Sequence, residues 1–269
     1  MSKTSRPLDS YIMLSVCVAS LLVMPNVFAQ SSTKSDNPPS ANSNAPSSGS
    51  DHRQWANDAR TAINAQDYET ALMAAKKIAA SSASLDYQLL AADTMLRCGD
   101  AHHAIVQFEK YLDKRPADRP HLWQLGIALY FDGKFKEGAE LFEKHREVNP
   151  NDVENAAWHF LCVAKGDSPE KAKQMLLPAP DDFRPPMKEV LEMLKSGDTA
   201  PVKERMTSFG DNESRAKSAQ FYGDFYLGLY ADALGDKATA QKHLDAAAKD
   251  SPRNYMGDVA KVYSRYLKK

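Results

Sequence analysis

A repeat of 34 residues is the feature of this sequence that most constrains its fold. Glycine, phenylalanine and proline each return as the same residue at that spacing: Gly99 and Gly133, Phe108 and Phe142, Pro116 and Pro150. Three periods further along, Gly126, Gly133 and Pro150 are matched by Gly228, Gly235 and Pro252. Such a period predicts structural units that stack side by side, because one unit alone cannot bury its apolar face.

Each unit is expected to be a pair of helices. In the third unit, Leu122, Leu125 and Leu129 recur at helical spacing, and Gly133 marks a turn before the second helix. The period and pattern resemble the tetratricopeptide repeat, which implies antiparallel helix pairs stacked into a superhelix. In that motif a small residue lets the paired helices approach closely. This role accounts for Gly126, which otherwise costs its helix about 1 kcal/mol relative to alanine.

The repeat register divides the chain into expected segments. Tetratricopeptide repeats are expected at about 52–84, 85–118, 119–152 and 221–254, followed by a solubilising capping helix at 255–267, all within a domain spanning 53–269. Residues 153–220 form a degenerate helical region with a proline-bounded loop at 178–186, and they are either eroded repeats or an insertion of coincidental length. The predicted fold class is all-α, an α-solenoid with an irregular helical insertion.

The N-terminal segment predicts export. Residues 1–29 combine Lys3 and Arg6 with an apolar run and the small residues Val27 and Ala29 before a cleavage point, as in a secretory signal peptide. The alternative is an uncleaved anchor. Cys17 follows valine inside the apolar run, so we do not expect lipidation. Residues 30–52 are rich in Ser, Asn and Pro and are expected to form a disordered linker. A periplasmic or envelope-associated protein without a stable membrane span is therefore predicted.

Composition and motifs argue for binding rather than catalysis. The 269 residues carry a formal net charge of −1 and no basic block, so a nucleic-acid partner is not expected. No phosphate-binding loop, dinucleotide fingerprint or hydrolase motif occurs in the sequence, and we predict no enzyme activity and no cofactor. His102 and His103 lack clustered ligands, which predicts no metal site. Asp181 and Asp182 are expected to shape a turn.

An aromatic stripe is the candidate binding surface. Trp123, Ile127 and Tyr130 share one helix face, distinct from the leucine seam, and Phe131 adjoins it. The last repeat places Tyr222, Phe225 and Leu229 on its equivalent face. These seven residues are predicted to line a concave groove that binds a protein or peptide, with Asp86, Asp93, Arg97 and Lys165 flanking it. The alternative is a groove filled from within, by residues 178–208, or by a dimer mate.

A closer family resemblance covers residues 55 to 267. The AAWHFL helix after NPND, the irregular helical hairpin and the final FYLGLYADALGDKATAQKHL repeat resemble the NlpI-like tetratricopeptide lipoproteins of bacterial envelopes. The resemblance implies a helical adaptor, commonly dimeric, that recruits peptidoglycan-processing or secretion components. A homodimerising assembly module without a foreign ligand is the first alternative, and a cell-wall enzyme is the second.

Overall fold

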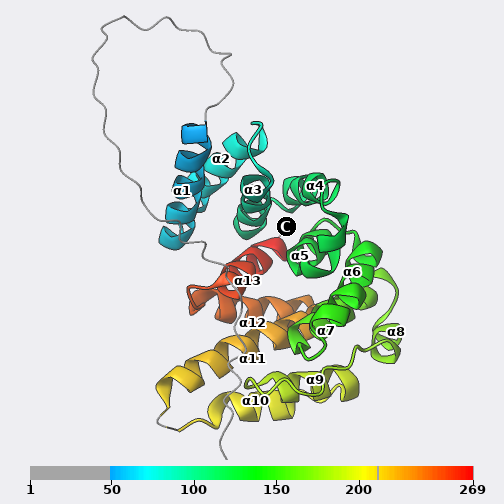
Figure 1. Ribbon diagram of the computed structural model, residues 1–269. Helices are drawn as coiled ribbons and strands as arrows, with labels where there is room; N and C mark the ends of the chain where they lie inside the picture. The colour runs from blue at the N-terminus through cyan, green and yellow to red at the C-terminus, as the bar shows by residue number, and fades with distance from the viewer. Residues whose placement is uncertain (1–48, 211, 269) are drawn as a thin grey trace, which may run out of the picture. The chain divides into compact units, whose positions relative to one another are not determined.

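The computed structural model describes residues 49–210 and 212–268, and this part of the chain contains helices and no strand (Figure 1). The described residues form thirteen α-helices and one short 3-10 helix, η1. In chain order the elements are α1 (Gly49–Ala65), α2 (Tyr68–Ala79), α3 (Leu85–Cys98), α4 (Ala101–Leu112), η1 (Pro116–His121), α5 (Trp123–Phe131), α6 (Phe135–Val148), α7 (Val153–Gly166), α8 (Pro169–Gln174), α9 (Met187–Ser196), α10 (Ala200–Thr207), α11 (Glu213–Ala233), α12 (Lys237–Lys249) and α13 (Tyr255–Tyr266). The all-α class predicted from the sequence is confirmed.

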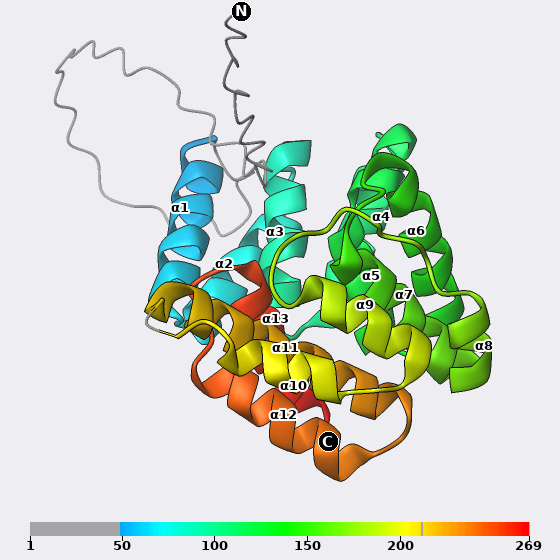
Figure 2. The same ribbon diagram turned by 90° about the horizontal axis from the view of Figure 1, so that it is seen from below.

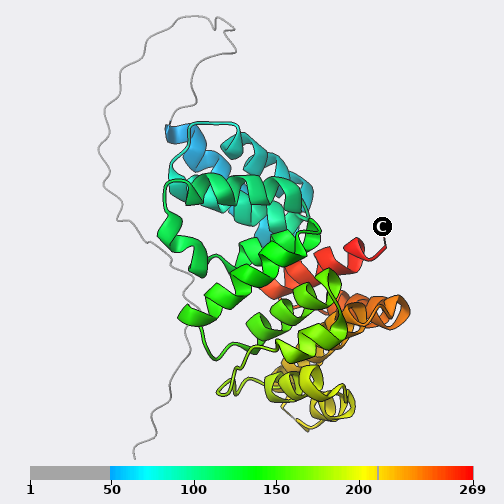
Figure 3. The same ribbon diagram turned by 90° about the vertical axis from the view of Figure 1, so that its right-hand side faces the viewer.

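Consecutive helices pack as hairpins. Helix α1 packs on α2, α3 on α4, α5 on α6 and α11 on α12, and Figure 3 shows the early hairpins following one another. Within each pair only a few residues connect the helices. Gly99, Gly133 and Gly235 occupy the last three of these four turns, with φ of 89°, 77° and 78°. Glycine adopts this left-handed conformation without a steric penalty, which explains its recurrence at the repeat spacing.

Gly126 allows α5 and α6 to approach each other. A Cβ atom at this position would lie 2.6 Å from Cζ of Phe142, well inside contact distance. Gly228 has the same role between α11 and α12, where a Cβ would lie 2.7 Å from Cγ of Leu244. The close approach predicted for Gly126 is confirmed.

The helix bounds can be compared with the segments expected from the sequence, and they differ from them at two places. Helices α3, α5 and α13 begin at or near the expected positions. Helix α1, however, begins at Gly49 inside the expected linker, and His52 is buried in it. Helix α11 begins at Glu213 instead of 221, because Asn212 caps its first turn by accepting a hydrogen bond from the Arg215 amide. The expected signal peptide at 1–29 and residues 30–48 of the linker lie outside the described residues.

The irregular region is part of the packed structure. Ser168 caps α8 by accepting a hydrogen bond from the Lys171 amide, and Pro169 occupies the first helical position. Gly197 ends α9 in the left-handed conformation, and α10 follows after a short turn. Helix α9 packs against α7 and α10 against α11, and Figure 2 shows α9, α10 and α11 together. The loop expected at 178–186 separates α8 from α9.

The last helix lies inside the structure. Helix α13 packs against α12, its neighbour in sequence, and against α3, which is far away in sequence (Figure 1). Its residues Met256, Val259, Ala260 and Tyr263 belong to the main apolar core. The expected solubilising cap at 255–267 is therefore corrected to a core helix. Within the described residues, none of the helices combines the length and the hydropathy needed to cross a bilayer.

Candidate functional site

The seven predicted groove residues are covered to different degrees. Ile127, Tyr130, Phe225 and Leu229 are fully buried, each with 0% exposure. Trp123, Phe131 and Tyr222 are partly buried and pack against the same core. The expectation that all seven line an open groove is therefore wrong. Contact of any of them with a partner stays a prediction.

Helix α13 covers four of the side chains that were expected to face a ligand, Trp123, Tyr130, Phe131 and Phe225. The ring of Tyr263 lies 5.5 Å from Tyr130, 5.3 Å from Phe131 and 5.9 Å from Trp158, measured between centroids. At the other end of α13, Tyr255 makes an edge contact with Trp123 at 4.8 Å. We call the surface of α3, α5 and α7 that receives α13 the inner face. Within the chain, α13 is the segment that covers these aromatic side chains, whereas residues 178–208 were expected to do so. From that expected segment, Met206 packs against Gly223 of α11, next to Tyr222.

Asp232 anchors α13 to the centre of the inner face. Its Oδ2 accepts hydrogen bonds from the hydroxyls of Tyr130 at 2.5 Å and Tyr263 at 2.6 Å. Its Oδ1 pairs with Nζ of Lys165 at 2.8 Å. Burial, followed by the Asp232 charge, raises the pKa of the Tyr130 hydroxyl, which stays protonated as a donor. One carboxylate of α11 therefore ties α5, α7 and α13 together.

Asp258 makes a second anchor at the start of α13. It accepts hydrogen bonds from the Tyr68 hydroxyl at 2.6 Å and from Arg97 Nε at 2.8 Å. Arg97 Nη2 adds an ion pair at 2.7 Å. Arg97 and Lys165 were expected at the rim of a ligand groove. Both instead pair with the carboxylates that hold α13 in place, Arg97 with Asp258 and Lys165 with Asp232.

A cavity remains open beside α13. Its volume is about 390 Å³, and its walls come from the α3–α4 turn, the end of α5 and the last turns of α13. We name it the Phe131 cavity after the one predicted groove residue that lines it; the other lining residues are Cys98, Gly99, Ala101, Val262, Arg265 and Tyr266. The rings of Phe131 and Tyr266 lie 5.2 Å apart. Burial raises the pKa of the Cys98 thiol to about 12, so this wall is uncharged.

The carboxylates near this cavity already have cationic partners. Asp100 pairs with Lys76 and His103. Asp132, next to Phe131, pairs with Lys134 at 2.8 Å and lies 3.4 Å from a ring nitrogen of His102. Arg265 lines the cavity and is exposed, and no ion pair joins it to a carboxylate of the described residues. The mouth therefore combines aromatic walls with one cation that has no carboxylate partner among residues 49–210 and 212–268.

Sequence reasoning missed the residues that α13 contributes. Val262, Arg265 and Tyr266 were assigned to a solvent-facing cap. A signal was present, because Met256, Val259, Ala260 and Tyr263 recur at the spacing of one buried helix face. That pattern shows that one side of α13 is covered, although it does not identify the covering surface.

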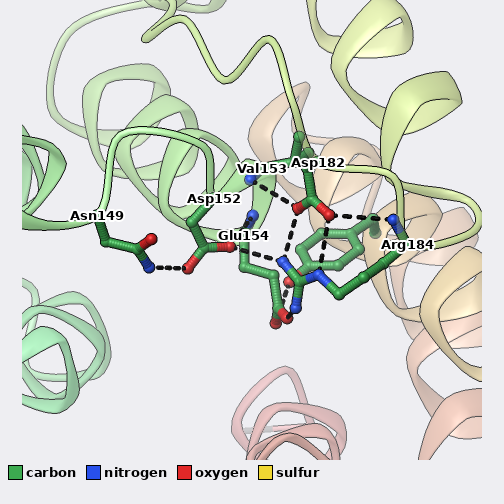
Figure 4. A network of polar contacts seen from close by, with 7 residues as sticks. Asn149, Asp152, Val153, Glu154, Asp182 and Arg184 are labelled. Atoms are coloured by element: carbon green, nitrogen blue, oxygen red, sulfur yellow. Dashed lines mark hydrogen bonds and ion pairs between the residues drawn. The ribbon is translucent and has the colours of Figure 1, made fainter. Parts of the chain in front are cut away.

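Asp182 and Arg184 lock the irregular loop onto the start of α7. Asp182 accepts a hydrogen bond from the Val153 amide at 3.1 Å and pairs with Arg184 Nη2 at 2.6 Å (Figure 4). The same guanidinium reaches Glu154 at 2.6 Å and Asp152 at 2.8 Å. The turn-shaping role expected of Asp182 is confirmed. Between these two anchors Phe183 projects outward with 86% exposure.

Three histidines each lie next to a different carboxylate. His103 pairs with Asp100, His243 with Asp224 and His159 with Glu143. Among the described residues, no group of three or more His, Cys, Asp or Glu side chains is arranged to hold a metal ion. Cys98 and Cys162 are unpaired thiols, of which Cys162 is buried and Cys98 is half-buried.

Comparisons with known proteins do not assign a family to this chain. No protein-family model matches its sequence. A search of curated proteins finds no significant match. The candidate site is therefore defined by its own side chains and geometry.

Proposed function

We propose that this protein is an exported tetratricopeptide-type adaptor that binds a protein or peptide partner at the Phe131 cavity. The proposed role is to hold a partner in the cell envelope, without catalysis. Such a partner could belong to peptidoglycan processing or secretion, as the family resemblance implies. The observation that carries the proposal is an open cavity on a rigid helical scaffold, with aromatic walls and an arginine that has no carboxylate partner in the described part of the chain.

Three features support a binding role. The helix hairpins recur with the 34-residue register and use glycine where that repeat needs it. The inner face is closed by α13 through satisfied polar groups, so the scaffold is preorganised and a partner need not order it. Aromatic side chains with an arginine are the residue types that dominate binding energy at protein interfaces.

A crosslinking pull-down tests this proposal. Mature protein 30–269 is compared with a Phe131→Ala/Tyr266→Ala variant and with Val106→Ala, which removes an exposed apolar side chain on α4. Circular dichroism and thermal unfolding establish that all three are folded. A partner retained by the wild type and by Val106→Ala but lost from the double variant supports the cavity as the site. Equal capture by all three, or no capture by any of them, contradicts it.

Phe183 favours a second candidate function, that of a self-assembling module. A phenylalanine with 86% exposure on an anchored loop leaves about 2 kcal/mol of burial unused in the monomer. Sedimentation velocity over a wide concentration range tests this candidate. Self-association that is abolished in Phe183→Ala and kept in Leu234→Ala, another exposed apolar position, supports it. A wild-type protein that stays monomeric contradicts it.

A further inference from the structure

The Phe131 cavity has the size of a site for one apolar side chain. Its volume of about 390 Å³ lies near the lower end of the range for ligand pockets, roughly 300 to 1,000 Å³. A cavity of about 150 Å³ already holds benzene. The ring faces of Phe131 and Tyr266 and the methyls of Val262 and Ala101 supply apolar walls, and the thiol of Cys98 is uncharged.

Arg265 places a cation at the edge of the same cavity. A Cβ added to Gly99 would lie 3.8 Å from Nη2 of Arg265 and 3.8 Å from Val262, so the guanidinium extends over the α3–α4 turn. Arg265 also lies over the Tyr68 ring, 5.5 Å from its centroid. Because residue 99 is glycine, no side chain fills this edge of the cavity. A ligand that fills the apolar space is therefore within reach of the guanidinium.

A second cation lies near Arg265. Lys261, one helical turn earlier, lies 5.9 Å from the same Tyr68 ring. Burial lowers the pKa of Lys261, as do the neighbouring charges of Arg265 and Arg253, whereas Asp258 opposes the change. Asp258 is already shared by Tyr68 and Arg97. Arg265 and Lys261 thus place two cations near the rim, beside Asp100 and Asp258, whose cationic partners are Lys76 and Arg97.

We infer that the Phe131 cavity binds the C-terminal residue of a peptide, with its apolar side chain inside the cavity and its α-carboxylate on Arg265. The side chain and the α-carboxylate branch from one Cα, so both can reach their sites at once. A guanidinium binds a carboxylate through two parallel hydrogen bonds, which a neutral terminal amide cannot reproduce. This inference rests on the proposed adaptor function and specifies the chemistry of the segment that the adaptor takes.

The probes for this inference are N-acetyl-phenylalanine and its neutral amide, N-acetyl-phenylalaninamide. Binding is followed by NMR of the Val262 and Ala101 methyl groups, which line the cavity. The carboxylate is expected to shift both signals and to bind at least tenfold more tightly than the amide. In Arg265→Gln the carboxylate should bind no better than the amide. Lys242→Gln, which removes an exposed cation on α12, should keep the preference.

Three outcomes overturn the inference. The first is equal binding of the acid and the amide to the wild type, and the second is an acid preference that survives in Arg265→Gln. The third is binding of decanoate at least tenfold more tightly than N-acetyl-phenylalanine, which would assign the cavity to a fatty acid. If partner capture depends on Phe131 and Tyr266 without any acid preference, the adaptor function stands and this inference alone fails. If the cavity prefers the acid but no partner is captured, the carboxylate site stands and the adaptor function fails.

Discussion

Single buried carboxylates determine where the last helix lies. Asp232 is completely buried and is satisfied by two tyrosine hydroxyls and Lys165, and Asp258 is satisfied by Tyr68 and Arg97. A buried charge with its partners in place is tolerated, whereas removing one member leaves the others unpaired and costs several kcal/mol. These residues therefore specify one position of α13 on the inner face.

Removal of Asp232 should destabilise the fold. Asp232→Ala leaves the hydroxyls of Tyr130 and Tyr263 and the amine of Lys165 without their shared acceptor, and we expect a loss of about 3 kcal/mol in the free energy of unfolding. Urea denaturation measures the change. Asp250→Ala, at an exposed position at the end of α12, is the control and should change stability by less than about 0.5 kcal/mol. A loss below about 1 kcal/mol in Asp232→Ala would contradict this anchor role.

Asp93 should make stability depend on pH. Burial raises its pKa to about 6, with a further contribution from the Asp258 charge, although Arg97 opposes the change. Since the unfolded-state pKa is about 3.9, Asp93 contributes stability below about pH 4 that is lost as the pH rises through 6. Asp93→Asn should therefore be more stable than the wild type at pH 7, by about 3 kcal/mol, and this gain should fade toward pH 4. Urea unfolding at several pH values checks this. A gain that is independent of pH would count against it.

At the scale of elements, the hairpins were predictable and their closure by α13 was not. The bounds of α5 and α6 follow from a local pattern, with apolar residues at helical spacing, Gly133 in the turn and Gly126 at the close approach. The position of α13 depends on contacts such as Tyr130 with Tyr263, which are far apart in the sequence. Periodicity gives which side of a helix is buried but not the surface that buries it. For that reason the prediction that all seven residues line an open groove was wrong.

Close packing of α5 on α6 predicts the effect of a single methyl group. Gly126→Ala places a Cβ within 2.6 Å of the Phe142 ring and should destabilise the fold by about 1 to 2 kcal/mol, despite alanine's better helix propensity. Gly49→Ala is the matched control, because nothing lies within 4 Å of the added Cβ. Chemical denaturation of both variants gives the comparison. A stabilised Gly126→Ala variant would show that Phe142 moves aside at little cost.

The loop between α8 and α9 should depend on Arg184. Arg184→Gln removes the cation shared by Asp152, Glu154 and Asp182 and should speed amide exchange at residues 177–186 at least tenfold. Hydrogen–deuterium exchange with mass spectrometry measures the rates. Arg205→Gln removes a 3.7 Å pair with Glu189 and contacts with Ser208 and Phe209, all outside the loop, and should leave the loop unchanged. Equal exchange in both variants would mean that apolar packing alone holds the loop.

Across the described part of the chain, α13 joins elements that a simple stack of hairpins would keep apart. In a solenoid each unit contacts only its neighbours in sequence. Here α13 also packs on α3, and its rings contact α5 and α7. The inner face is thereby closed, and the Phe131 cavity is the part of it that we propose for a partner. The central structural claim is that α13 closes the inner face and leaves only the Phe131 cavity open within the described residues.

Nuclear Overhauser spectroscopy on protein with labelled aromatic and valine residues tests the position of α13 on the inner face most directly. We expect cross-peaks between the Tyr263 ring and the Trp158 indole, whose centroids lie 5.9 Å apart, and between the Val262 methyls and Gly99. Both sets should be present in the free protein. Absence of both, with Tyr263 shifts typical of a solvated tyrosine, would show that α13 leaves the inner face open and would return that face to its predicted role as a groove.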